Sequence, residues 1–152
     1  MAFNLSQKSL DKMDGVDERL QRVVKRAIQL SKQDFMVLEG VRTIKQCMIN
    51  YGKGRTIAQC VAKGVPAQYA NTNAAKVTWL NDPFASKHVN GKAVDLVPYP
   101  VDWDDLKKFD DIAHAMLQAA KELGITIRWG ADWDADGKPR ERGESDSPHF
   151  EI

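Results

Sequence analysis

The chain is organised around the stretch SKHVNGKAVDL, which spans residues 86–96. Within it, residues 93–97 alternate between two faces, a period of two that predicts a β-strand. Asp95 then points to the opposite face from Val94 and Leu96. A carboxylate inside such an apolar run is costly unless a positive charge compensates it. The stretch therefore predicts a strand whose carboxylate has a cationic partner.

A metal ion is one such partner, and the imidazole of His88 indicates which kind. The segment DSPHFEI, residues 146–152, supplies a second imidazole, His149, which alternates with Phe150 as in a strand. Pairing of that strand beside Asp95 would bring three nitrogen and oxygen ligands together. Two histidines and one carboxylate, with a fourth position open to water, are the usual ligands of catalytic zinc. Taken singly, each residue also has a structural interpretation, as a hydrogen-bonded histidine or a turn-forming aspartate.

Taken together, the two segments resemble a family signature. The pattern Ser-x-His-x-x-Gly-x-Ala-x-Asp over residues 86–95, followed by Asp-x-x-His over residues 146–149, is similar to that of the zinc D-alanyl-D-alanine carboxypeptidase and L-alanyl-D-glutamate peptidase family. Within that family, the phage endolysins that are L-alanyl-D-glutamate endopeptidases match best. The resemblance begins at about residue 34 and reaches residue 152, but the insert over residues 52–83 does not clearly fit it.

The resemblance implies roles for individual residues. Zinc would be held by His88, Asp95 and His149, and Asp146 would be the general base. In the family, an arginine at a strand-to-helix corner points into the cleft. The corresponding residue here is Arg42. Its planar guanidinium suits a substrate carboxylate or carbonyl oxygen, although a surface arginine with a local ion pair is the alternative. Ser86 is expected to orient a metal ligand or the substrate.

A second candidate metal site follows near residues 132–144. Acidic residues alternate there before Gly137, which is how a calcium loop opens. The twelfth position of an EF-hand loop is Gly143 here, so the match to that loop is imperfect. Some relatives among the phage peptidases carry a calcium-regulated loop, which favours Ca²⁺, while a solvated acidic turn is the alternative. The candidate calcium ligands are Asp132, Asp134, Asp136, Glu141 and Glu144.

The periodicities predict an α+β fold, with a small antiparallel sheet, helices packed against it and the zinc site on the open sheet face. This is the hedgehog/D-Ala-D-Ala peptidase-like arrangement that the resemblance implies. Asp14 and Asp102 are the expected N-caps of the two long helices, and Gly124 is expected to end the second one. Thr43 could cap a further helix that runs through residue 49. The expected strands are residues 35–40, 93–98, 125–129 and 148–152, and the expected long helices are residues 16–32 and 103–123.

Composition limits the classes of function. The chain has 152 residues, the length of a single domain. Its 22 basic and 21 acidic residues give a net charge of +1, which does not favour binding of nucleic acid. It shows no secretory signal and no run of about 20 apolar residues, so no stable membrane association is expected. Cys47 and Cys60 are expected to be free thiols. We expect a monomeric, single catalytic domain over residues 1–152, without a separate wall-binding domain.

The function that the sequence predicts is a zinc-dependent peptidoglycan peptidase, a phage endolysin that hydrolyses the L-alanyl-D-glutamate bond of the stem peptide. The neighbouring alternative is a D-alanyl-D-alanine carboxypeptidase, and a more distant one is a noncatalytic zinc-containing wall-binding domain. The absence of His-Glu-x-x-His and Gly-x-Ser-x-Gly motifs argues against other zinc peptidases and serine hydrolases. By the resemblance, the enzyme is made in the host bacterial cytoplasm and reaches the wall after a holin opens the inner membrane.

Overall fold

The computed structural model describes residues 2–152, which form two compact units. The first unit comprises the residues up to Val41 together with residues 91–152, and the second comprises residues 42–90. Among the described residues, no helix is both long and apolar enough to cross a membrane.

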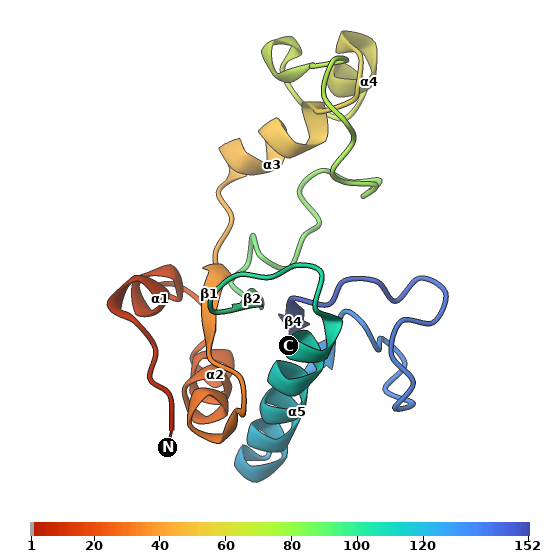
Figure 1. The fold of residues 1–152 in the computed structure, drawn as a ribbon. Coiled ribbons are helices and arrows are strands. Elements are labelled where there is room, and N and C mark those ends of the chain that lie inside the picture. Colours follow the sequence, from red (N-terminus) through yellow and green to blue (C-terminus); the bar gives the residue numbers. More distant parts are fainter. Residues whose placement is uncertain (1) are drawn as a thin grey trace. The chain divides into compact units, whose positions relative to one another are not determined.

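The first unit contains a four-stranded antiparallel sheet with the strand order β1-β2-β4-β3 (Figure 1). The α+β class and the antiparallel sheet are therefore confirmed. The last strand in sequence lies inside the sheet, between β2 and β3, so residues that are far apart in the chain become neighbours. The strands are β1 (Phe35–Glu39), β2 (Ala93–Pro98), β3 (Arg128–Trp129) and β4 (His149–Glu151).

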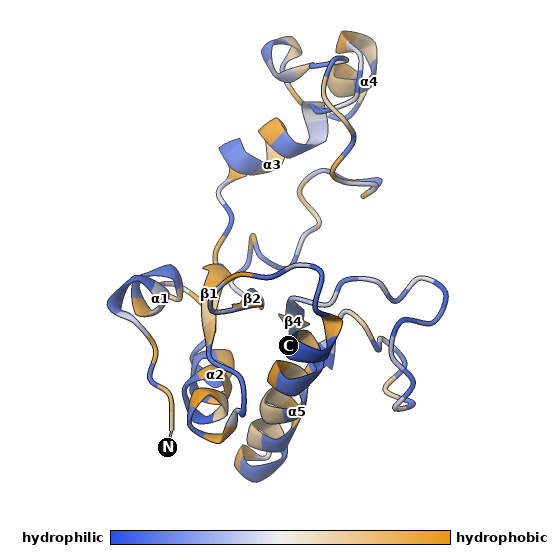
Figure 2. Cartoon of the chain, in the orientation of Figure 1, coloured by the Kyte–Doolittle hydropathy of each residue, from blue (hydrophilic) through white to orange (hydrophobic). Residues whose placement is uncertain are grey.

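Two amphipathic helices, α2 (Glu18–Leu30) and α5 (Leu106–Leu123), contact each other and cover one face of the sheet (Figure 1). Apolar and hydrophilic residues alternate along both ribbons in Figure 2, as expected for helices with one face in a core. Val94, Leu96 and Phe150 point into this core. The side chains that alternate with them along β2 and β4 therefore lie on the other face of the sheet.

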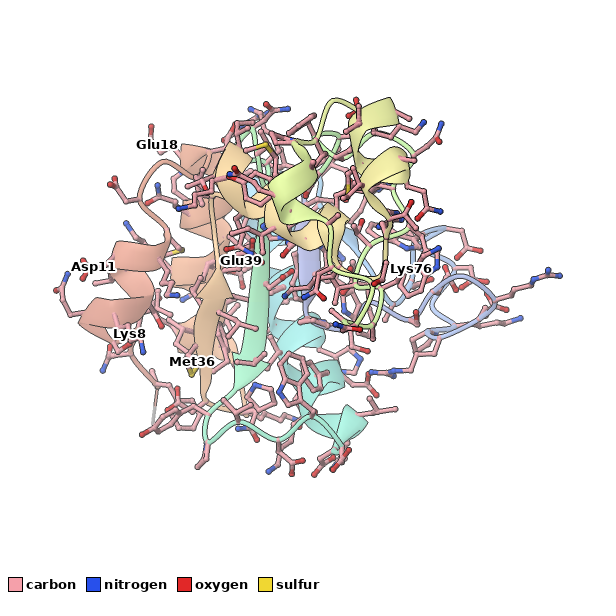
Figure 3. All side chains as sticks on the ribbon, turned by 90° about the horizontal axis from the view of Figure 1, so that it is seen from above. Lys8, Asp11, Glu18, Met36, Glu39 and Lys76 are labelled. Carbon is pink, nitrogen blue, oxygen red and sulfur yellow. The ribbon has the colours of Figure 1, made fainter. Side chains whose placement is uncertain are left out.

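A short helix that the sequence did not predict, α1 (Gln7–Lys12), precedes α2. The exposed side chains of Lys8, Asp11 and Glu18 point outward in Figure 3. The buried Ser9 faces inward, and its hydroxyl accepts a hydrogen bond from the Val37 N–H of β1 at 3.1 Å. The helix is therefore attached to the edge of the sheet by a polar contact as well as by packing.

The start of α2 is tied to the glycine of the His88–Asp95 motif. The N-cap is Asp17, not Asp14, and its backbone N–H donates to the Gly91 carbonyl at 2.8 Å. Gly91 has φ +69°, and a Cβ there would lie 2.5 Å from the Gly15 carbonyl oxygen, so only glycine fits. Hydrogen bonds from Arg19 and Lys92 hold the pKa of the Asp17 carboxyl well below its usual range.

The ends of α5 match the sequence pattern in part. The helix ends as predicted at Gly124, which adopts the left-handed conformation at φ +68°. Its N-cap is Asp105 and not Asp102. The Asp102 carboxylate instead accepts hydrogen bonds from the backbone N–H groups of Asp104 and Asp105, so it stabilises the turn before the helix.

The second unit is helical and has its own small core. It contains α3 (Ile44–Gly52), α4 (Ile57–Ala62) and the 3₁₀ turn η1 (Ala67–Tyr69). Thr43 caps α3 as predicted, and Thr56 forms a capping box with Gln59. Cys47 and Cys60 are both buried. The core of this unit consists of Tyr51, Cys60 and Val65.

We expect Met116→Ala to lower the free energy of unfolding by about 2–5 kcal/mol, because Met116 is 0% exposed and its truncation leaves a cavity between α5 and the core. The matched control is Leu117→Ala on the next residue of the same helix, which is 41% exposed and should change stability by about 0.5 kcal/mol or less. Denaturant unfolding of both variants measures the difference. Equal losses would contradict this description of the core.

Candidate metal and catalytic site

The pairing of β2 with β4 brings Asp95 and His149 directly opposite each other. The His149 Nδ1 atom lies 3.3 Å from the Asp95 Oδ1 atom. Both side chains are on the sheet face opposite to Val94 and Phe150. The sequence predicted that residues 86–96 and residues 146–152 contribute to one site. Asp95 and His149 do lie close together.

Asp146 lies one turn of chain before His149. The two residues close a turn in which the His149 N–H donates to the Asp146 carbonyl at 3.2 Å. The Asp146 Oδ2 atom is 3.9 Å from the His149 Nδ1 atom, and the Asp146 side chain is 53% exposed. The carboxylates of Asp95 and Asp146 thus face the same ring nitrogen, and that of Asp146 is half-exposed to solvent.

Gly130 holds the turn that carries Asp146. Its N–H donates to the His149 carbonyl at 2.8 Å, and its own carbonyl accepts from the Asp146 N–H at 3.1 Å. A Cβ atom at residue 130 would lie 2.3 Å from the Asp146 carbonyl oxygen. The neighbouring Trp129 indole donates to the Ser147 carbonyl at 2.7 Å. The backbone of Asp146 is therefore fixed from both sides.

Arg140 supports the same turn and was not identified from the sequence. Its Nε–H donates to the Ser147 hydroxyl at 3.2 Å, and its guanidinium forms an ion pair with Asp110 of α5 at 2.8 Å. It also lies over the Trp129 ring, 5.7 Å from the centroid. Nothing local in the sequence marks this residue, because its ion-pair partner is 30 residues away.

Glu151 is the second residue that the sequence analysis missed. Its Oε1 atom lies 2.9 Å from the His149 Nε2 atom, and its Oε2 atom lies 3.4 Å from Arg128. Burial lowers the pKa of His149, but hydrogen bonds with Asp95 and Glu151 raise this pKa, and the net shift is upward. The signal that could have revealed Glu151 is its spacing of two from His149, which puts both side chains on one face of the strand.

His88 is buried, at 2% exposure, and its backbone is fixed by two residues that the sequence analysis singled out. The His88 N–H donates to the Ser86 hydroxyl at 3.3 Å. The His88 carbonyl accepts from the backbone N–H of Arg42 at 3.0 Å. Ser86 and Arg42 therefore order the segment that carries His88.

Asp95 and His149 each offer one ligand atom to a metal ion, a carboxylate oxygen and an imidazole nitrogen. The third residue that the sequence predicted as a ligand, His88, belongs to the second unit. Two imidazole nitrogens and one carboxylate oxygen suit zinc better than calcium or magnesium, which prefer oxygen ligands alone. The donor set therefore fits the metal that the sequence predicted.

The acidic segment after β3 forms two further groups of potential ligands, which share Asp134. Glu144 is 5% exposed; its Oε2 atom accepts from the Asp134 N–H at 3.2 Å, whereas its Oε1 atom is buried without a hydrogen-bond partner. A hydrogen bond with Asp136 raises the pKa of the Glu141 carboxyl, because the two acids are close together. The groups are Asp132, Asp134 and Asp136, and Asp134, Glu141 and Glu144.

The solved structures that resemble the fold include two peptidases. The crystal structure of the L-Ala D-Glu endopeptidase ChiX of Serratia marcescens matches with a TM-score of 0.64 and 26% identity, covering 100% of this chain and 91% of that one. The D,D-pentapeptidase VanY of a VanB-type vancomycin resistance cassette matches with a TM-score of 0.50 and 18% identity, covering 90% of this chain and 72% of that one. The VanY likeness supports the fold alone.

Sequence comparison identifies the family. The L-alanyl-D-glutamate peptidase of Escherichia phage T5 is 36% identical over 158 residues, which cover 100% of this chain and 99% of that protein. The model of the phage L-alanyl-D-glutamate peptidase family matches in two overlapping parts, residues 1–68 and 59–152. The likeness therefore extends through residues 52–83, which the motif comparison had left outside the pattern. The chain belongs to the family of phage L-alanyl-D-glutamate peptidases, as its two histidine motifs predicted.

Proposed function

We propose that this protein is a zinc-dependent peptidase that hydrolyses the L-alanyl-D-glutamate bond in the stem peptide of bacterial peptidoglycan. The observation that carries the proposal is the arrangement of Asp95 and Asp146 around one ring nitrogen of His149. It occurs in a chain that is similar over its whole length to an L-alanyl-D-glutamate peptidase. The ChiX likeness, to an L-Ala D-Glu endopeptidase, agrees with this choice of bond.

The proposed zinc ligands are His88, Asp95 and His149. Two imidazole nitrogens and one carboxylate oxygen support this assignment, since they are usual ligands of catalytic zinc. VanY, which shares the fold, was crystallised in complex with Zn(II). A zinc ion held by these residues would lower the pKa of a water molecule and polarise the scissile carbonyl. The residues themselves must then bind the peptide and move the proton.

Asp146 is the proposed general base. It is half-exposed, so that a water molecule can reach it, and its backbone N–H donates to the Gly130 carbonyl. It takes a proton from the attacking water and gives it to the leaving amine, a task that first requires correct placement. Arg42 is proposed to bind a substrate carboxylate or carbonyl oxygen through its guanidinium, and Ser86 to support His88 through the backbone.

Digestion of purified sacculi with mass analysis of the products tests the proposal. We expect release of peptides that begin with D-glutamate and leave L-alanine on the muramyl residue. Free D-alanine would instead indicate the carboxypeptidase, and binding without any release would indicate a noncatalytic wall-binding domain. Removal of zinc with a chelator should stop release, and added Zn²⁺ should restore it.

Gly130→Ala is expected to lower kcat by about 100-fold while zinc stays bound, because the added methyl group would displace the Asp146 backbone. Gly130 has no positive φ, so alanine itself is compatible with the backbone and the effect comes from contact alone. Product release, zinc content and thermal unfolding are measured together. A variant with normal kcat would show that the Asp146 turn tolerates displacement.

We also propose that residues 1–152 act as one monomeric catalytic domain on the stem peptide. The match to the phage T5 relative, which covers the whole of this chain, supports a single catalytic domain. As a member of a phage peptidase family, the enzyme is proposed to be made in the host cytoplasm and to reach the wall once a holin has opened the inner membrane. Lysis of intact cells only when such an opening is provided would test this route.

Ca²⁺ is proposed to bind the acidic segment through the two carboxylate groups that share Asp134. The buried, unpartnered Oε1 atom of Glu144 supports this, since a buried carboxylate oxygen without a partner is costly and a cation would satisfy it. Calorimetric titration of the zinc-loaded protein with Ca²⁺ should show one site, which is lost in Glu144→Gln and kept in the control Glu122→Gln. The proposal fails if Ca²⁺ does not bind, or if Asp134→Ala matches the wild type with and without Ca²⁺. The ligands would come from Asp132, Asp134, Asp136, Glu141 and Glu144.

A further inference from the structure

His149 is held between carboxylates on its two ring nitrogens. On one side, Nδ1 faces Asp95 at 3.3 Å and Asp146 at 3.9 Å. On the other side, Nε2 lies 2.9 Å from Glu151. His149 and Glu151 are both buried, at 8% and 6% exposure. The orientation of the ring is therefore fixed by groups on both of its edges.

The backbone determines this arrangement. His149 and Glu151 are two residues apart on β4, so their side chains share one face of the sheet. Arg128 lies opposite Glu151 in the pairing of β3 with β4, and its guanidinium contacts the Glu151 carboxylate at 3.4 Å. An adjacent guanidinium favours the ionised form of a carboxylate, which can only accept hydrogen bonds.

A neutral imidazole has one N–H donor and one nitrogen lone pair, and a metal requires the lone pair. If zinc binds on the Asp95 side, Nδ1 must supply the lone pair, and the proton must be on Nε2. The Glu151 Oε1 atom lies 2.9 Å from Nε2, so in this tautomer it would accept the hydrogen bond from Nε2–H. A carboxylate in this position fixes the tautomer and makes the ligand more basic.

We propose that Glu151 is a positioning residue that keeps the proton of His149 on Nε2 and thereby presents Nδ1 to zinc. The inference rests on the proposed function, because it requires zinc at this site. Glu151 does not touch substrate in this role; it acts through His149.

The first test uses the wild-type protein loaded with zinc and labelled with ¹⁵N-histidine. Proton–nitrogen correlation spectra should show His149 protonated at Nε2 and metal-bound at Nδ1. Zinc bound through Nε2 would overturn this inference and leave the proposed function standing. Failure of the wild type to bind zinc at all would overturn both.

The second test measures zinc affinity by competition with a chromophoric chelator. Glu151→Gln should raise the zinc Kd by about 10-fold and Glu151→Ala by up to about 100-fold, because glutamine still accepts the hydrogen bond but carries no charge. Arg128→Gln, which removes the ion pair and keeps the carboxylate, should have the smaller effect. The surface control Glu122→Gln, which also loses an arginine partner, should bind zinc like the wild type.

Thermal unfolding of each zinc-free variant separates this role from a purely structural one. If Glu151→Ala does not fold, Glu151→Gln decides the question. A wild-type Kd in a folded Glu151→Gln or Glu151→Ala protein would overturn the inference.

Discussion

His149→Ala is expected to abolish zinc retention and peptide release together. His149 is the residue on which the site converges, since Asp95, Asp146 and Glu151 all lie within 4 Å of its ring nitrogens. Without its imidazole, the donor set falls to one histidine and one carboxylate, which is fewer than the three protein ligands of catalytic zinc sites. Metal analysis of the purified variant and mass analysis of digested sacculi measure the two losses.

The matched control for this variant is His114→Ala. His114 is exposed on α5 and belongs to none of the described groups of potential metal ligands. It should keep wild-type zinc content and activity. Zinc retained at full occupancy in His149→Ala would contradict the assignment of this ligand, and full activity would contradict the proposed mechanism.

Asp146→Ala should retain zinc and lower kcat by about 10²–10⁴-fold, the usual contribution of a positioned acid–base group. The Asp146 side chain is half-exposed and is not one of the three proposed zinc ligands, so its removal leaves the donor set intact. The pair of variants therefore separates metal binding from proton transfer. Single-turnover release from sacculi, with zinc content measured on the same sample, is the appropriate experiment.

Asp104→Asn serves as the control for Asp146→Ala, because Asp104 is an exposed acid in the turn before α5. It should leave kcat unchanged. Loss of zinc from Asp146→Ala would mean that Asp146 is a metal ligand, and unchanged kcat would mean that another group takes the proton from water.

Local patterns in the sequence were sufficient to predict the main elements. The alternation around Asp95 predicted β2, Thr43 predicted the start of α3, and Gly124 predicted the end of α5. The N-caps were less well predicted, because several acids precede each long helix and any of them can accept a backbone N–H. The chain uses Asp17 and Asp105, the acids immediately before the first helical residue.

The supporting residues of the site could not be predicted in the same way. Gly130 and Arg140 act on the Asp146 turn only because β4 lies between β2 and β3, and no local pattern specifies that strand order. Glu151 was overlooked although it shares a strand face with His149. The motifs identified the residues that meet at the site, whereas tertiary pairing determines what holds them there. The roles of Arg42 and Ser86 toward substrate remain predictions.

The strand order has a consequence for how the enzyme acquires activity. β3 joins the sheet through β4, and β4 also carries His149. β3 therefore cannot join the sheet before the strand that delivers the proposed ligand. A folding intermediate that lacks β4 would lack both β3 and His149, so it should not cut peptides. During refolding, amide protection in β3 should not appear before metal affinity is recovered.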